Sequence, residues 1–310
     1  MNYYVTFFDK NYLPHGMALY ESMCKFCNPF KLIILCVDDK TFEIINLLKL
    51  ENVQLLKLSN SENEELKKAK KTRTQTEYCW TLTPFSIRFA FESNSLVDQI
   101  TYIDADMWFM KSPQPIFDEL KESKKEILIT RHGFSKEYDD QTNVSGEFCV
   151  QFITFNRKAE DIRVEWEQNC LKWCFNRIEE GKFGDQKYLE EWPQKYSSRV
   201  HISKNDEWFL APWNATRFNY ENGIVWHFHA AKILSNRNFE LLGLKCLEYE
   251  IPLSTQNFVY KNYFASLKNS VYMLKKLNFN ISNNYKYNIR TIMRELLKKL
   301  VNKNFNFLVK

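Results

Sequence analysis

The first hundred residues alternate between short apolar runs and amphipathic segments, and this alternation constrains the fold more than any other feature of the sequence. The runs are rich in β-branched and aromatic residues, whereas the segments between them have helical periodicity. Strands that alternate with helices predict a mostly parallel α/β sheet with helices on both faces. The expected strands are 3–8, 31–37, 53–58 and 99–104, and the expected helices are 14–26, 40–50 and 77–93.

After these elements the pattern is less regular. The polar stretch 132–147 predicts a long loop, followed by a strand over 148–155 and a helix over 158–178. No proline- or glycine-rich linker divides the core. We therefore predict one α/β domain over 1–250 and a helical C-terminal extension over 251–310.

Composition narrows the class of protein. The N-terminus has no basic segment followed by an apolar one, and the longest apolar stretch, LIILCV, is too short to cross a bilayer, so a cytoplasmic protein is expected. Eight cysteines are too sparse for a disulfide scaffold. The pairs Cys24–Cys27 and Cys170–Cys174 could form a four-thiolate zinc site, but buried free thiols are the favoured interpretation.

Glycine is scarce in the N-terminal half, where Gly16 is the only glycine before Gly133. A phosphate-binding loop of the dinucleotide or P-loop kind needs glycines between an early strand and the next helix. The sequence contains no such loop. A phosphorylated ligand in this half would need another means of neutralising its charge.

The stretch YIDADMWFM, residues 102–110, places Asp104 and Asp106 directly after an expected strand. Ligands of open parallel sheets bind beyond the carboxyl ends of the strands. Two carboxylates one residue apart can hold a divalent cation, which removes their mutual repulsion. A turn in which one aspartate caps the next element is the alternative.

Two other segments carry polar residues suited to a site. GIVWHFHAAK places His227 and His229 two apart, so that on a strand both rings would lie on one side. Two carboxylates with a histidine suit Mn²⁺ or a similar cation better than Ca²⁺, although either histidine could be an ordinary half-buried residue. In GKFGDQKYLEEW, capping of a helix would explain Asp185 but not Gln186, a neutral polar residue that can face a cleft.

Taken in order, TFFDKNY, TLTPFSIRF, YIDADM, GKFGDQKYL, APWN and WHFHAAK resemble the landmarks of nucleotide-sugar glycosyltransferases of the GT-A type, whose fold is Rossmann-like. The resemblance covers about residues 3–235. It is greatest to retaining enzymes of family eight and to bacterial relatives that build surface polysaccharides. It implies a nucleotide-sugar donor, a saccharide acceptor, Mn²⁺ or Mg²⁺ as cofactor, and no nucleic-acid partner.

The resemblance also assigns roles to individual residues. It implies that Asp185, Gln186 and Arg88 act at the donor sugar. The family usually has glycine where Ala230 stands and asparagine where Cys149 stands. The implied metal ligands are Asp104, Asp106 and His227, with His229 as the alternative, and the implied donor-binding residues are Thr6, Phe7, Asp9, Asn11, Tyr12, Asp104, Ala105 and Lys232.

A metal held by these ligands would let a glycine-poor chain manage a diphosphate, because it stabilises the leaving group without a proton donor. Asp9 and Tyr12 favour a uridine donor. Inversion would need a carboxylate base, for which Asp139, Asp140 and Glu147 are candidates. Retention would place Asp185 or Gln186 beside the anomeric carbon, and the family resemblance favours retention.

Three other classes share parts of the pattern. A phosphatase of the haloacid dehalogenase type has its Asp-X-Asp after the first strand, whereas about a hundred residues precede Asp104. A sugar nucleotidyltransferase would normally carry a glycine-rich basic N-terminal signature, which this sequence lacks. A non-catalytic sugar-binding relative would not need all of Asp104, Asp106, Asp185 and His227.

The tail 283–310 combines an apolar stripe at helical spacing with seven basic residues and one glutamate. A helix lying on an anionic membrane gains from both features, at roughly 1 kcal/mol per basic residue near the surface. We expect peripheral contact with the inner face of the cytoplasmic membrane and, with it, a lipid-linked saccharide as the acceptor. A helix packed on the catalytic domain is the alternative.

Overall fold

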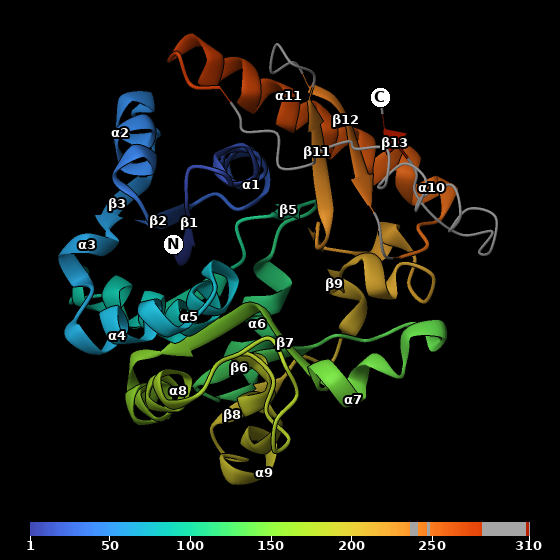
Figure 1. Cartoon of the computed structure of the whole chain (residues 1–310). Coiled ribbons are helices and arrows are strands. Elements are labelled where there is room, and N and C mark those ends of the chain that lie inside the picture. The colour runs from blue at the N-terminus through green and yellow to red at the C-terminus, as the bar shows by residue number, and fades with distance from the viewer. Residues whose placement is uncertain (236–240, 247–248, 281–307, 310) are drawn as a thin grey trace.

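A seven-stranded sheet forms the centre of the molecule, with strand order β3-β2-β1-β4-β7-β6-β8 (Figure 1). The computed structural model describes residues 1–235, 241–246, 249–280 and 308–309. Neighbouring strands run parallel, except that β7 is antiparallel to both β4 and β6. The predicted mostly parallel α/β fold is therefore confirmed. The sheet consists of β1 (Asn2–Phe8), β2 (Phe30–Cys36), β3 (Val53–Lys57), β4 (Gln99–Ile103), β6 (Ile127–Arg131), β7 (Phe148–Asn156) and β8 (Val200–Ile202).

The helices follow the predicted alternation. Helix α5 starts in a capping box formed by Thr74 and Glu77, and the side chain of Asp38 caps α2. The expected helix 158–178 was wrong at its end, because extended backbone at Trp173 terminates α8 at Lys172. The α-helices are α1 (Leu13–Phe26), α2 (Asp39–Leu48), α3 (Leu58–Ser61), α4 (Glu64–Thr72), α5 (Gln75–Glu92), α6 (Gln114–Ser123), α7 (Gln141–Ser145), α8 (Glu160–Lys172), α9 (Trp192–Lys195), α10 (Leu253–Thr255) and α11 (Lys261–Lys276).

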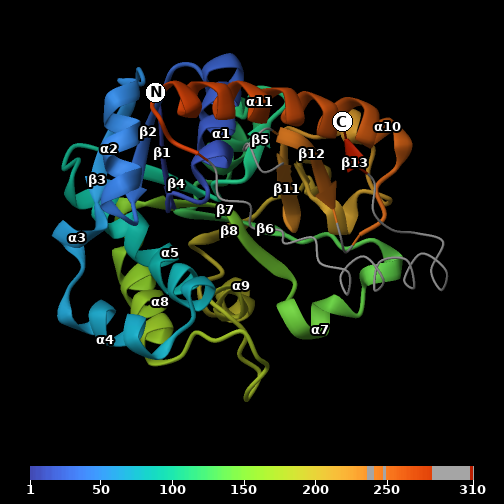
Figure 2. The same cartoon turned by 45° about the horizontal axis from the view of Figure 1, so that its top comes forward.

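The central sheet is buried on both faces, which explains its continuous apolar strands. Along β2, Leu32 and Ile34 pack into the core that contains side chains of α1, α2, α6 and α11. Ile33, between them, packs into the core that contains side chains of α5 and α8. Figure 2 shows α1, α2 and α11 on one side of the sheet and α5 and α8 on the other.

A smaller sheet lies beyond the carboxyl end of β4 and has the order β5-β10-β9. The chain leaves β4 at Ile103 and enters β5 after a turn of three residues. Because β10 comes from much later in the chain, this sheet brings distant segments to the same edge. Its strands are β5 (Met107–Phe109), β9 (Phe209–Leu210) and β10 (Val225–His227).

The C-terminal part of the described chain packs on this body. Helix α11 lies along α1, and the Tyr263 hydroxyl lies 2.6 Å from Nδ1 of His15. A third sheet contains β11 (Ala231–Ser235), β12 (Leu241–Cys246) and β13 (Leu308–Val309). Apart from β13, the predicted membrane-binding tail 283–310 lies outside the described residues. Among the described helices, none is long and apolar enough to cross a membrane.

Candidate active site

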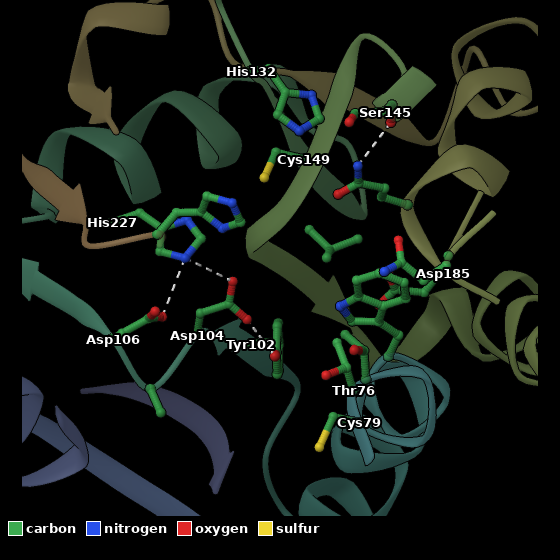
Figure 3. Close-up of a pocket in the computed structure, with 18 of the residues that line it drawn as sticks. Thr76, Cys79, Tyr102, Asp104, Asp106, His132, Ser145, Cys149, Asp185 and His227 are labelled. Atoms are coloured by element: carbon green, nitrogen blue, oxygen red, sulfur yellow. Dashed lines mark hydrogen bonds and ion pairs between the residues drawn. The ribbon is translucent and has the colours of Figure 1, made fainter. Parts of the chain in front are cut away.

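Two aspartates and a histidine converge beyond the carboxyl end of β4 (Figure 3). Asp104 and Asp106 occupy the turn between β4 and β5. Strand β10 pairs antiparallel with β5 so that His227 lies opposite Met107, next to this turn. His227 Nε2 is 3.2 Å from Asp106 Oδ1 and 3.5 Å from Asp104 Oδ2. Ligand atoms of the three residues all lie within 4.8 Å of one another, which makes them a candidate metal site.

The three residues of the cluster shift one another's pKa values. Burial raises the pKa of Asp104, and the negative charge of Asp106 adds to this rise although His227 opposes it. Burial would also raise the pKa of Asp106, but the charge and hydrogen bond of His227 hold it well below its usual range. Burial would lower the pKa of His227, but Asp106 raises it. Two carboxylate oxygens and an imidazole nitrogen are a donor set that fits a borderline divalent cation such as Mn²⁺.

Buried side chains hold the ligands in place from behind. The Tyr102 hydroxyl donates a hydrogen bond of 2.6 Å to Asp104 Oδ1. Gln151, on β7, places its Oε1 2.8 Å from His227 Nδ1. The ligand atoms that face the cavity are thus backed by polar atoms of the sheet.

The cluster opens into a cavity of about 570 Å³. The cavity runs from the end of β1 past the metal cluster to Asp185 and to α7. Its charged lining includes Asp9, Asp104, Asp106 and Asp185, and no lysine or arginine of the described chain lines it. Histidines 132, 227 and 229 also line it.

Five of the predicted donor-binding residues line the cavity at the metal or near the end of β1: Phe7, Asp9, Tyr12, Asp104 and Ala105. Tyr12 is 43% exposed, and the charge of Asp106 is the main cause that raises the pKa of its hydroxyl above the usual value. Asn11 is not part of the lining. It donates its backbone N–H and its side-chain amide to the two oxygens of Asp9. Thr6 is fully buried and does not reach the cavity either.

Asp185 and Gln186 line the cavity, with Asp185 across from the metal cluster (Figure 3). Asp185 is 2% exposed and precedes the short 3-10 helix η3 (Gln186–Glu191), but its side chain makes no capping hydrogen bond, so the capping interpretation was wrong. Burial raises the pKa of Asp185 to about 7, which Thr83 opposes and the charge of Asp104 reinforces. Gln186 donates from Nε2 to the carbonyl of Ser145 at 2.9 Å.

The structure does not bring Arg88 to the cavity. Arg88 follows Thr83 by five residues on α5, and at about 100° per residue this turns its side chain away from the cavity wall on which Thr83 lies. Its Nη1 instead lies 3.1 Å from Oε2 of the buried Glu167, and its Nε 3.5 Å from Glu92.

Lys232 and the three acids proposed for inversion also do not line the cavity. Lys232 is exposed on β11, which pairs with β12. In the predicted loop, Glu147 pairs with Arg131 at 2.6 Å. Asp139 and Asp140 lie between η1 (Lys136–Tyr138) and α7.

His229 lines the cavity but is not part of the metal cluster. Strand β10 ends at His227, so the two histidines do not share a strand as predicted. Their ring centroids are nevertheless 5.6 Å apart, and both rings contact Trp213. Ala230 has a φ of 59°, a left-handed conformation that explains why glycine is usual there.

Sequence reasoning missed the wall that α5 contributes. Thr76, Cys79, Trp80 and Thr83 line the cavity from this helix. They recur at the i, i+3, i+4 and i+7 spacing of one helix face. That spacing was the signal that could have identified them.

Comparisons with known proteins find relatives in sequence and in fold. No protein-family model matches the chain. The chain is 29% identical over 293 residues to the uncharacterized protein YfnF of Bacillus subtilis (strain 168). The alignment covers 88% of this chain and 94% of YfnF.

Among solved structures, mouse xyloside xylosyltransferase 1 superposes with a TM-score of 0.51 at 12% identity, over 74% of this chain and 97% of that chain. The galactosyltransferase LgtC, in complex with donor and acceptor sugar analogs, has a TM-score of 0.50 at 13% identity, over 86% of this chain and 95% of that chain. The chain therefore has the GT-A fold of glycosyltransferases, with a candidate Asp-X-Asp metal site at the edge where ligands of such sheets bind.

Proposed function

We propose that this protein is a metal-dependent glycosyltransferase that moves a hexose from a nucleotide-diphosphate sugar to a saccharide or lipid-linked saccharide. The observation that carries the proposal is the Asp104–Asp106–His227 cluster, which opens into a cavity of about 570 Å³. This volume lies in the range of roughly 300–1,000 Å³ that is usual for small-molecule sites.

The charges of the cavity are consistent with a diphosphate only if a cation accompanies it. Asp104, Asp106 and His227 hold Mn²⁺ or Mg²⁺ in this proposal, and the cation supplies Lewis-acid stabilisation of the diphosphate leaving group. Because no lysine or arginine of the described chain lines the cavity, the cluster is where the charge of the donor is balanced. The nucleotide lies toward Asp9 and Tyr12, and the exposed phenol ring of Tyr12 stacks on the base, for which we propose uracil.

The arrangement of polar and acidic residues around the cavity favours transfer with retention. Asp185 and Gln186 contact the donor sugar, while the acids proposed as bases for inversion lie outside the cavity lining. In the retaining reaction the acceptor oxygen bonds to the anomeric carbon on the face from which the diphosphate leaves. The proton of the acceptor hydroxyl passes to the departing phosphate oxygen.

The test is turnover of a panel of nucleotide sugars in Mn²⁺ without an acceptor. We expect slow release of nucleoside diphosphate from one donor, fastest with a UDP-sugar, and no release by the Asp106→Asn variant. The configuration of a product formed with an added acceptor, read by NMR coupling constants, tests retention. Release of inorganic phosphate from simple monoesters would instead indicate a phosphatase.

A further inference from the structure

A buried glutamine lies directly behind the histidine of the metal cluster. Gln151 has no exposed surface and sits in β7, where every residue from Phe148 to Phe155 is buried. An aliphatic side chain would suit such a strand better, because burial of an amide costs free energy unless the amide is hydrogen bonded. Its Nε2 has no hydrogen-bond partner among the residues that the structure describes. Within the described ranges, the side chain of Gln151 hydrogen bonds only to His227.

Gln151 contacts both segments that carry the cluster. Its backbone carbonyl accepts a hydrogen bond of 3.1 Å from the backbone N–H of Asp104. Its side-chain Oε1 lies 2.8 Å from His227 Nδ1, while His227 Nε2 faces Asp104 and Asp106. Gln151 therefore connects the turn that carries the two aspartates with the ring of His227 through hydrogen bonds.

We propose that Gln151 is a positioning residue of the metal site, an inference that rests on the proposed metal-dependent function. An amide oxygen can only accept, so it holds a ring proton on Nδ1, and Nε2 is then the nitrogen that would give up its proton to bind a cation between the two aspartates. It also fixes the rotation of the ring. Because an amide is neutral, it does this without adding a third negative charge behind the cluster.

The experiment measures binding of Mn²⁺ alone to the full-length protein, with free Mn²⁺ quantified by electron paramagnetic resonance. Gln151→Met keeps the length of the side chain but removes the acceptor, and we expect a 10- to 100-fold loss of Mn²⁺ affinity. Gln151→Glu restores an acceptor for Nδ1 and should bind Mn²⁺ at least as tightly as the unmodified protein. As a matched control, Thr154→Val on the same strand removes the hydrogen bond of 2.9 Å to Thr101 without touching His227, and should leave affinity unchanged.

A double-mutant cycle separates positioning from a general effect on the strand. If Gln151 acts through the histidine, Gln151→Met should cause no further loss of affinity in a His227→Ala background. Equal losses in both backgrounds, or unchanged affinity of the single Gln151→Met variant, would overturn the proposal while leaving the metal site intact. If the unmodified protein bound no Mn²⁺, or if His227→Ala bound it normally, the metal site itself would be refuted.

Discussion

Replacement of Asp185 by asparagine should make the stability of the metal-free protein less dependent on pH. Asp185 is 2% exposed, and its Oδ2 has no hydrogen-bond partner within the described ranges of the chain. The pKa rises from 3.8 to about 7, mainly because burial disfavours the charged form. At 1.36 kcal/mol per pH unit, this rise corresponds to a cost of roughly 4 kcal/mol for the ionised folded protein, as an upper limit.

The sign of the effect follows from where the proton is bound. Between pH 3.8 and about 7 the folded protein retains the Asp185 proton, whereas the unfolded chain has released it. The free energy of unfolding therefore decreases as pH rises through this interval. The amide introduced by the substitution does not titrate, so Asp185→Asn should match the unmodified protein below pH 4 and exceed it increasingly up to about pH 7.

Urea unfolding between pH 4 and pH 9 in EDTA measures this difference. Other titrating groups are common to both proteins and cancel in the comparison. EDTA is needed because a cation on Asp104 would weaken the contribution of that charge to the pKa of Asp185. A difference that stays constant with pH, or that shrinks as pH rises, would refute the burial argument.

Three further predictions concern the metal and the membrane. His227→Ala should raise the Mn²⁺ concentration needed for donor turnover far more than His229→Ala, because of these two histidines His227 is the one in the cluster with both aspartates. Equal, mild effects of the two substitutions would mean that the metal site is misplaced. Calorimetry should show that EDTA abolishes binding of nucleoside diphosphate, since no lysine or arginine of the described part lines the cavity; undiminished binding would contradict this. In vesicle flotation, the full-length chain should bind anionic but not neutral vesicles, and binding should weaken at high salt. A chain ending near residue 283 should not float. Binding that is independent of lipid charge would argue that the tail is a packed helix.

The sequence by itself determined the elements whose signals are local. The four strands expected before residue 105 and the strand over 148–155 match the observed ends to within one residue. Their apolar periodicity depends only on near neighbours and on burial of both sheet faces. The position of Asp104 and Asp106 was predictable for the same reason, because it follows from the end of β4.

The tertiary structure brings His227, rather than His229, into the candidate cluster with the aspartates, because β10 pairs with β5. Strand pairing joins segments more than a hundred residues apart, and no periodicity within either segment records it. The exclusion of Arg88 is a similar case. Its charge was visible in the sequence, but the rotation of α5 against the sheet directs it to Glu167.

The burial of Asp185 and the contact of Gln151 with His227 also required the fold. A lone aspartate before a short helix is typical of a helix cap, and a glutamine in an apolar strand is an exception to the hydrophobic pattern of that strand. Only packing shows that Asp185 lies buried across the cavity from the metal cluster and that Gln151 lies behind the histidine. Local propensity places residues along an element, whereas the chemistry of the site depends on which elements meet.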